Sequence, residues 1–234
     1  PWRWDGPTAG EVLRLGWPIA LTVAFETGLF AVSALLMGRF GPASLAGHQI
    51  AIQTASMTFM VPLALGIATT ARVGHAVGRG DPLGARAAGV VGIAASLLVM
   101  SATALLYLTA PRVVVALYLD LADPQNAAVV AHAVAFLGVA AAFQLFDGLQ
   151  VSALGALRGM KDTRAPMLIT LVSYWFVGLG SGVWLAFGRG LDGVGLWWGL
   201  VIGLAVASIA LAARFAVLLR RLRRPSPAAV DSPA

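Results

Sequence analysis

Residues 15–37 read LGWPIALTVAFETGLFAVSALLM, an apolar stretch with a single carboxylate, Glu26, at its centre. A helix of about 20 residues spans the roughly 30 Å hydrocarbon core of a bilayer, so this stretch is long enough to cross it. A charged side chain at that depth is costly, and such residues commonly mark ion or substrate pathways. The stretch therefore predicts a transmembrane helix that carries a functional acid.

The composition extends this interpretation to the whole chain. Hydrophobic residues make up 59% of the 234 residues, charged residues only 11%, and the mean hydropathy is +0.85, whereas charged residues alone reach about 25% in soluble domains. The predicted fold class is an all-α polytopic membrane protein with a six-helix lobe over residues 15–219. Residues 1–14 are expected to be a cytoplasmic segment or linker, and residues 220–234 a basic, disordered cytoplasmic tail. The five further spans are predicted at 45–70, 87–110, 127–157, 166–188 and 193–219.

The basic residues are distributed unevenly between the two sides of this predicted bundle. If the N-terminus is cytoplasmic, all but three of the 16 Lys and Arg residues fall on the cytoplasmic side, the exceptions being Arg39, Arg112 and Arg189. By the positive-inside rule, we expect both ends of the chain to be cytoplasmic. The expected location is the inner membrane of the cell. The net charge of +6 follows from this topology, and no aromatic-interleaved basic face indicates nucleic acid as a partner.

The residue types present disfavour most enzyme chemistry. The chain has no cysteine, which excludes disulfides and thiolate metal sites, and it contains no nucleophile elbow, phosphate loop or metal-ligand cluster. Residues 78–81 spell the glycine-x-glycine-aspartate of some intramembrane aspartyl proteases, but they lie in a basic loop before Pro82 and are interpreted as a turn. We expect no catalytic residues, no cofactor and no resident metal.

A second acid, Asp147, lies inside the stretch 127–157 and has a polar and aromatic setting. Phe143, Gln144 and Gln150 occur at helical neighbour spacing from it, so they share its face. The charge of a buried carboxylate depends strongly on its surroundings, so two such acids can exchange protons or bind an ion as the structure changes. Glu26 and Asp147 are predicted to couple transport to an ion, and the predicted substrate-binding residues are Phe30, Gln49, Gln53, Phe143, Gln144 and Gln150.

Several short motifs occur together in an order that resembles a known family. The chain from about residue 10 to 220 is similar to the C-terminal half of a multidrug and toxic compound extrusion (MATE) transporter of the NorM type. The motifs that carry the resemblance are Phe25–Glu26, Gly47–Gln49, Arg72–Gly74 with Gly78 and Asp81, Phe146–Asp147, Leu157–Gly159 with Lys161, Asp162 and Thr163, and Ser173–Trp175.

The resemblance implies a twelve-helix antiporter of two six-helix lobes, of which this chain supplies the second. Such a transporter expels cationic or amphipathic small molecules in exchange for sodium ions or protons by alternating access. A missing N-terminal lobe is then the expected partner within the bilayer, and the start at Pro1 without a methionine fits a fragment. Glu26 and Asp147 match the family's acidic positions on its seventh and tenth helices. Some sodium-coupled relatives have a tyrosine where this chain has Phe143, which favours protons here.

Three alternatives are open at this stage. A lipid-linked saccharide flippase of the same superfamily would line its cavity with several cationic side chains, and none is found at depth. A membrane-embedded hydrolase would need a pair of acids at one depth, which Glu26 and Asp147 can supply. A channel or structural subunit would show conductance without saturation or counter-ion dependence.

Overall fold

The computed structural model describes residues 6–222, which form long helices joined by short connections. The regular elements follow one another in the order α1 (Gly6–Met37), η1 (Gly38–Phe40), α2 (Pro42–Gly78), α3 (Pro82–Thr109), α4 (Pro111–Val115), η2 (Pro124–Asn126), α5 (Ala127–Gly159), α6 (Arg164–Leu171), η3 (Val172–Gly178), α7 (Leu179–Val183), η4 (Trp184–Gly188) and α8 (Asp192–Leu222).

The prediction of six membrane helices is confirmed. Six helices among the described residues are long and apolar enough to cross a membrane, and each matches one of the predicted stretches, although the third helix ends at Thr109, one residue before the predicted end. The helices extend beyond those stretches, because α1 already begins at Gly6 and α8 continues to Leu222. The predicted disordered tail lies, from residue 223 onward, outside the described residues.

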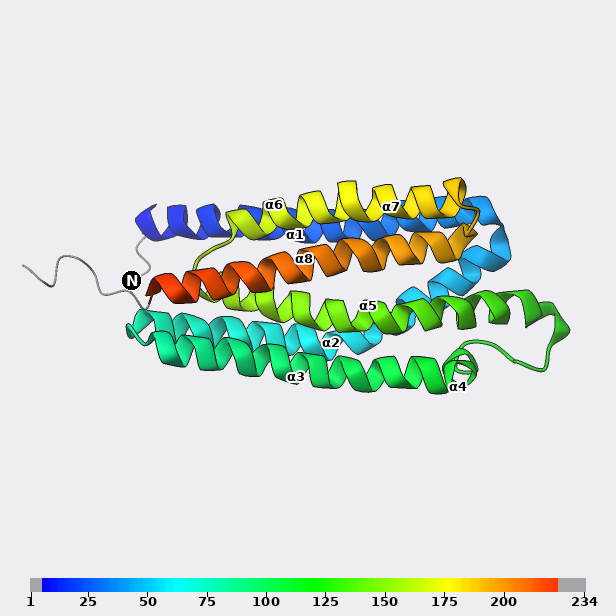
Figure 1. The fold of residues 1–234 in the computed structure, drawn as a ribbon, viewed down its shortest axis with the longest axis horizontal. Coiled ribbons are helices and arrows are strands. Elements are labelled where there is room, and N and C mark those ends of the chain that lie inside the picture. Colours follow the sequence, from blue (N-terminus) through cyan, green and yellow to red (C-terminus); the bar gives the residue numbers. More distant parts are fainter. Residues whose placement is uncertain (1–5, 223–234) are drawn as a thin grey trace, which may run out of the picture.

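The six spans run side by side as one elongated bundle, with consecutive spans antiparallel (Figure 1). At one end of the bundle lie the start of α1, the α2–α3 turn, the α5–α6 turn and the end of α8 (Figure 1). Of the described Lys and Arg residues, all except Arg39, Arg112 and Arg189 belong to this end or to helix segments that approach it, so we name it the basic end. Exposed aromatic side chains lie near the other end, as expected at a membrane interface: Tyr118, Trp184, Phe187 and Trp198.

Helix α5 is the centre of the bundle because α2, α3 and α8 all pack on it. Its contact with α2 is unusually close where two glycines meet: a Cβ added to Gly155 would lie 3.0 Å from the carbonyl carbon of Gly66. Without hydrophobic driving force between helices in lipid, close van der Waals contact through small residues holds such bundles together. The glycine spacing on α8 serves the same purpose, since a Cβ on Gly182 would lie 3.3 Å from Cα of Gly199.

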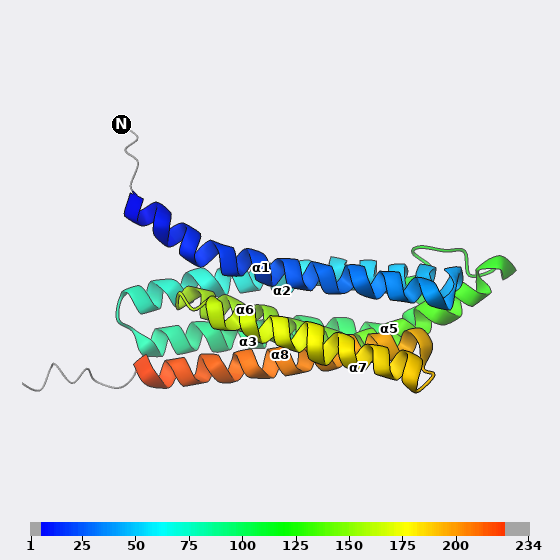
Figure 2. The ribbon, with the colours of Figure 1, turned by 90° about the horizontal axis from the view of Figure 1, so that it is seen from above.

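Helix α1 stands apart from the rest of the bundle. Figure 2 shows its N-terminal part bending away from the other helices. Pro18 lies inside this helix, where it lacks a backbone donor and permits a bend. Large apolar side chains on both halves of α1 are exposed, including Leu13 and Leu35.

The fifth span contains two π-helical segments. Between α6 and α7, residues Val172–Gly178 (η3) form a π-helix, and a second π-helical segment, Trp184–Gly188 (η4), ends the span. A π-helical segment shifts the direction of the following side chains relative to an α-helix, and such segments are frequent at functional sites. This winding decides where Tyr174 and Trp175 point.

The turn predicted at residues 78–81 is confirmed. Helix α2 ends at Gly78, Gly80 adopts a φ of 67°, and Asp81 is the N-cap of α3. The carboxylate of Asp81 accepts a hydrogen bond from the Gly84 amide at 2.8 Å, as N-cap side chains do. This geometry gives the glycine-x-glycine-aspartate segment a structural explanation.

Two ion pairs hold the α5–α6 turn, and we expect them to differ in their effect on stability. Arg214 of α8 donates two hydrogen bonds to Asp162, at 2.5 and 3.1 Å, whereas the Lys161–Glu11 pair is exposed. Asp162→Asn should therefore lower the free energy of unfolding by about 1 kcal/mol, a value reduced by solvent around the half-exposed Arg214. Lys161→Gln, the matched control, should change it little. Thermal unfolding in detergent tests this, and equal effects of the two variants would contradict it.

Candidate functional site

Glu26 lies on the face of α1 that turns toward the bundle. The side chain is half-buried, and Phe30 follows it one turn later. Gly28 lets α1 approach η3 closely, because a Cβ at this position would lie 3.1 Å from the ring of Trp175. The position of Glu26 is thus set by contact between α1 and the π-helical segment.

The two predicted acids meet in one cleft. Glu26 of α1 and Asp147 of α5 both line a space of about 40 Å³, which we name the acid cleft. Asp147 is almost completely buried, with 4% of its surface exposed. The remaining lining residues come from α1, α2 and α5: Phe30, Ile52, Ala55, Ser56, Phe59 and Phe143.

A smaller apolar space adjoins the acid cleft on the other side of Glu26. It measures about 10 Å³ and is lined by Glu26, Phe30, Phe143 and Tyr174, together with Leu29, Leu200 and Leu204. The rings of Phe30 and Phe143 lie edge to face, 6.2 Å apart, between the two spaces. The two phenylalanines therefore form an aromatic wall beside Glu26.

Neither carboxylate forms an ion pair in the part of the chain that the structure describes. The ion pairs formed by residues 6–222 are Lys161–Glu11 and Arg214–Asp162. Glu26 and Asp147 interact through their charges, and the charge of Arg158 also acts on Glu26, although Arg158 does not line the cleft. Two like charges in a dry cleft repel each other strongly, so the cleft favours uptake of a proton or another cation.

The structure brings only some of the predicted substrate residues to this cleft. Phe30 and Phe143 line it. Gln150 is buried beside Tyr174 and lines neither of the two spaces around Glu26. Gln49 and Gln53 lie on the exposed face of α2, outside the cleft.

Gln144 points away from the acids into a polar network between α2, α3 and α5. Its amide donates hydrogen bonds to Thr58 (2.6 Å), Thr103 (3.2 Å) and Tyr107 (3.4 Å). These bonds fix the side chain at the helix contact, and the cleft lining does not include it. Its position is that of an interhelical hydrogen-bonding residue.

Three residues near the acids were not among the sequence-predicted site residues. Ser56 lines the acid cleft, Tyr174 approaches both acids, and Arg158 acts on Glu26. The position of Tyr174 depends on the π-helical winding of η3, for which the sequence carries no signal. Arg158 follows the predicted span 127–157 and was counted with the basic residues of the cytoplasmic side.

A larger groove lies elsewhere, between α2 and α3 at the basic end. It measures about 510 Å³ and is lined by Arg72, His75 and Arg79 together with mainly small apolar residues. It contains neither Glu26 nor Asp147. Size alone therefore does not identify the site of the two acids.

Comparisons with known proteins agree with this architecture. Residues 18–184 match the family MatE. The chain is 48% identical over 209 residues to a multidrug resistance protein NorM of Burkholderia vietnamiensis (89% of this chain, 45% of that protein), and 50% identical over 213 residues to a probable one of Deinococcus radiodurans (90% and 47%). A crystal structure of MATE in complex with MaL6 superposes with a TM-score of 0.86 at 16% identity, covering 96% of this chain and 50% of that one.

These matches show the family and the extent of the similarity. The chain spans about half the length of the curated relatives it matches. Those relatives are named as multidrug resistance proteins and not as enzymes. The family match covers well over half of the chain and includes Glu26 and Asp147, and six helices among residues 6–222 are long and apolar enough to cross a membrane; the protein is therefore a multi-pass membrane protein of the MatE family.

Proposed function

We propose that this chain is one lobe of a cation-coupled antiporter that exports cationic or amphipathic small molecules by alternating access. The observation that carries the proposal is the acid cleft, which both Glu26 and Asp147 line and in which neither acid forms an ion pair among residues 6–222. The names of the relatives support multidrug efflux as the activity. A lipid-linked saccharide flippase is disfavoured, because this lining is acidic and contains no arginine or lysine.

The acid cleft is large enough for the coupling ion but too small for a drug. A water molecule needs about 10–15 Å³ of such volume, so a cleft of about 40 Å³ holds a proton, or a small cation with a few waters. Drug-sized ligands occupy pockets of about 300–1,000 Å³. The lobe on its own thus offers an ion site, and the drug site is completed by the second lobe.

The exposed polar face of α2 is a suitable wall for that shared drug site. Gln49, Gln53 and Ser56 follow one another at helical neighbour spacing, and all three are exposed. Ser56 also lines the acid cleft, so this face connects the cleft with the surface. We expect the second lobe to lie opposite this face of α2. During transport, one lobe would rock against the other around the binding site.

Competition for the acids supplies the coupling. A cation in the acid cleft neutralises Glu26 or Asp147 and removes the attraction for a cationic drug. The membrane potential favours inward cation movement by about 2.3 kcal/mol per charge per 100 mV, which can drive the drug outward. For this coupling to drive export, the protein must lie in the inner membrane with its basic end facing the cytoplasm.

Reconstitution of the full-length protein into proteoliposomes tests the proposal. Sodium and proton gradients are imposed separately, and efflux of a fluorescent cationic compound is followed. We expect efflux to saturate and to require one of the two inward gradients. Conductance without saturation would contradict the proposal in favour of a channel, and transport independent of both gradients would contradict the coupling.

The ring of Phe143 gives a finer prediction about the coupling ion. This side chain lines the acid cleft but has no oxygen to offer to a sodium ion, so we expect proton-driven efflux in the wild type. Phe143→Tyr adds a hydroxyl to the lining of the acid cleft. This should increase the stimulation of efflux by sodium several-fold, since one hydrogen bond or coordination contact contributes on the order of 1 kcal/mol. Phe143→Leu is the matched control, and equal sodium responses of the two variants would contradict the prediction.

A further inference from the structure

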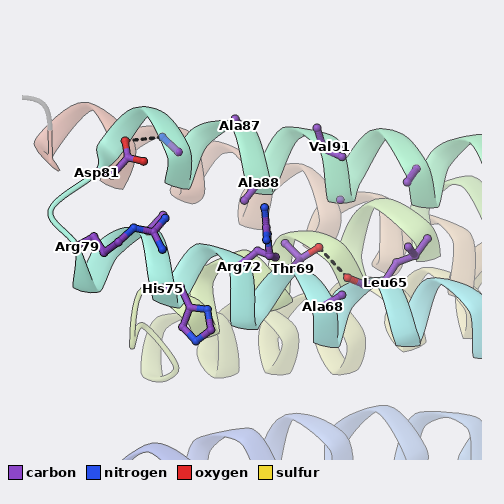
Figure 3. A pocket seen from close by; sticks show the side chains of 14 residues that line it. Leu65, Ala68, Thr69, Arg72, His75, Arg79, Asp81, Ala87, Ala88 and Val91 are labelled. Atoms are coloured by element: carbon purple, nitrogen blue, oxygen red, sulfur yellow. Dashed lines mark hydrogen bonds between the residues drawn. The ribbon is translucent and has the colours of Figure 1, made fainter.

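The groove between α2 and α3 opens where the two helices separate toward the basic end. Further along, the helices touch: a Cβ on Gly92 of α3 would lie 3.1 Å from the side-chain carbons of Thr69 of α2. The groove runs past this contact, from Leu65 and Ala95 to the α2–α3 turn, and measures about 510 Å³ (Figure 3). It is more than ten times larger than the acid cleft.

One wall of the groove presents two basic side chains. Arg72 of α2 and Arg79, the residue that follows α2, are both exposed and line the groove. Figure 3 shows the Arg72 side chain extending toward α3 and the Arg79 side chain lying along α2 near the turn, whereas the ring of His75 points to the opposite side of α2. Seven residues correspond to about 10 Å along a helix, so both guanidinium groups can reach one phosphate or two neighbouring phosphates.

The guanidinium groups of Arg72 and Arg79 are available for a ligand. Neither belongs to the ion pairs formed within residues 6–222. The one acid in the lining, Asp81, is engaged at the N-terminus of α3, where it accepts the Gly84 amide at 2.8 Å. The groove therefore has an excess of positive charge that no described side chain neutralises.

The deeper part of the groove is apolar. Beyond Arg72 its walls are Leu65, Ala68, Val91 and Ala95, whereas Ala87 and Ala88 lie opposite Arg72 (Figure 3). From Arg79 to Leu65 the groove follows α2 for about 21 Å. The hydrocarbon of one leaflet is roughly 15 Å thick, and the headgroup layer adds to this, so the groove is about as long as one leaflet is thick. The basic residues thus lie at headgroup level and the apolar walls at the level of the acyl chains.

The outer surface of α3 identifies the medium next to the groove. Leu83, Val90, Val91 and Leu98 are between 51% and 74% exposed, as expected for a face that contacts lipid tails. We propose that the groove binds an anionic phospholipid, with its phosphate on Arg72 and Arg79 and an acyl chain along α3. Basic pockets between transmembrane helices are suited to such headgroups. The proposal needs only the membrane location of the bundle and is separate from the transport mechanism.

Lipid retention measures the role of the two arginines. The full-length protein is delipidated in detergent, titrated with phosphatidylglycerol or phosphatidylcholine, and analysed by native mass spectrometry. We expect preference for phosphatidylglycerol and an affinity about thirtyfold lower in R72Q/R79Q. R39Q/R112Q, which removes two arginines from the opposite end, should stay within about twofold of the wild type. Equal binding of both lipids, or equal losses in both variants, would overturn the proposal.

Steric variants test the groove without changing its charge. Ala68→Phe and Ala87→Phe narrow the groove at exposed positions, so we expect folded protein with the same thermal unfolding temperature and reduced phosphatidylglycerol binding. Unchanged binding would place the lipid on the surface and overturn the groove site. Displacement by inorganic phosphate at equal concentration would show a free-anion site and would also overturn it.

A cysteine probe distinguishes lipid from protein as the occupant. The chain has no cysteine, so Ala87→Cys adds one reporter to it. We expect a lipid-soluble maleimide to label this cysteine in the delipidated full-length protein, and phosphatidylglycerol to protect it. Protection that persists without lipid would show that the other half of the protein or a second copy covers the groove. Because none of these measurements uses efflux, their outcome does not depend on the proposed transport activity.

Discussion

Replacing Asp147 by asparagine is expected to abolish ion-driven efflux by the full-length protein. Asp147 is 4% exposed and faces Glu26 across a cleft of about 40 Å³, so a cation in this space lies close to its carboxylate. A unit charge about 4 Å away contributes about 4 kcal/mol at an effective dielectric constant of 20. Part of this is offset by desolvation, and we expect the affinity for the coupling ion to fall roughly a hundredfold.

Glu26→Gln should also lower ion-driven efflux and the affinity for the coupling ion, but by less than Asp147→Asn. Glu26 is only half-buried, so water screens its charge more than that of Asp147. Both substitutions keep the size of the side chain, and neither acid forms an ion pair within residues 6–222. The variants should therefore fold, and their effect on efflux reports on charge.

The measurement is efflux from proteoliposomes as a function of the driving-ion concentration. Asp120→Asn, an exposed carboxylate in the connection before η2, is the matched control and should behave like the wild type. Unfolding temperatures establish that each variant is folded. Unchanged ion dependence in folded Asp147→Asn protein would remove the acid cleft from the mechanism.

Gly155→Leu is expected to prevent stable folding of the lobe. Gly155 lies where α5 crosses α2, and a Cβ there would approach the Gly66 carbonyl oxygen and lie 3.0 Å from its carbon, both backbone atoms. The same crossing is stabilised by a hydrogen bond of 2.9 Å from the Thr70 hydroxyl to the Gly155 carbonyl. A leucine would force apart the largest helix interface of the bundle.

The smaller Gly155→Ala variant gives a measurable version of this effect. We expect it to lower the free energy of unfolding by about 1–3 kcal/mol, as overpacking of a core does. Gly138→Ala lies on the same helix, where a Cβ would have nothing within 4 Å, and is the matched control. Thermal unfolding in detergent compares the variants, and equal stability of both would show that α2 and α5 can separate at little cost.

The features of the fold that depend on helix length and backbone chemistry were predictable from the sequence. The six spans follow from uninterrupted apolar stretches, and the turn at Asp81 from the combination of Gly80, an N-cap residue and Pro82. In each of these cases, neighbours in the sequence determine the local structure.

Which neighbouring helix or cleft each polar side chain faces was harder to predict from the sequence. Gln144 and Asp147 are three residues apart on α5, yet the former turns to Thr58 and the latter to the acid cleft. Helices α2, α3 and α8 pack on different faces of α5, so periodicity along the sequence does not tell which neighbour each face meets. Tyr174 poses a different difficulty, because the π-helical winding of η3 changes its direction.

The loose attachment of α1 has a mechanical consequence for the charge that it carries. On one side α1 is joined to α2 through the short segment η1, and near its other end the exposed Lys161–Glu11 pair is its ionic tether. A pivot of α1 about Pro18 or η1 changes the separation of Glu26 from Asp147 while α2, α5 and α8 keep their mutual contacts. Movement of α1 alone can thereby change the electrostatic field of the acid cleft, while the packing among α2, α5 and α8 stays the same.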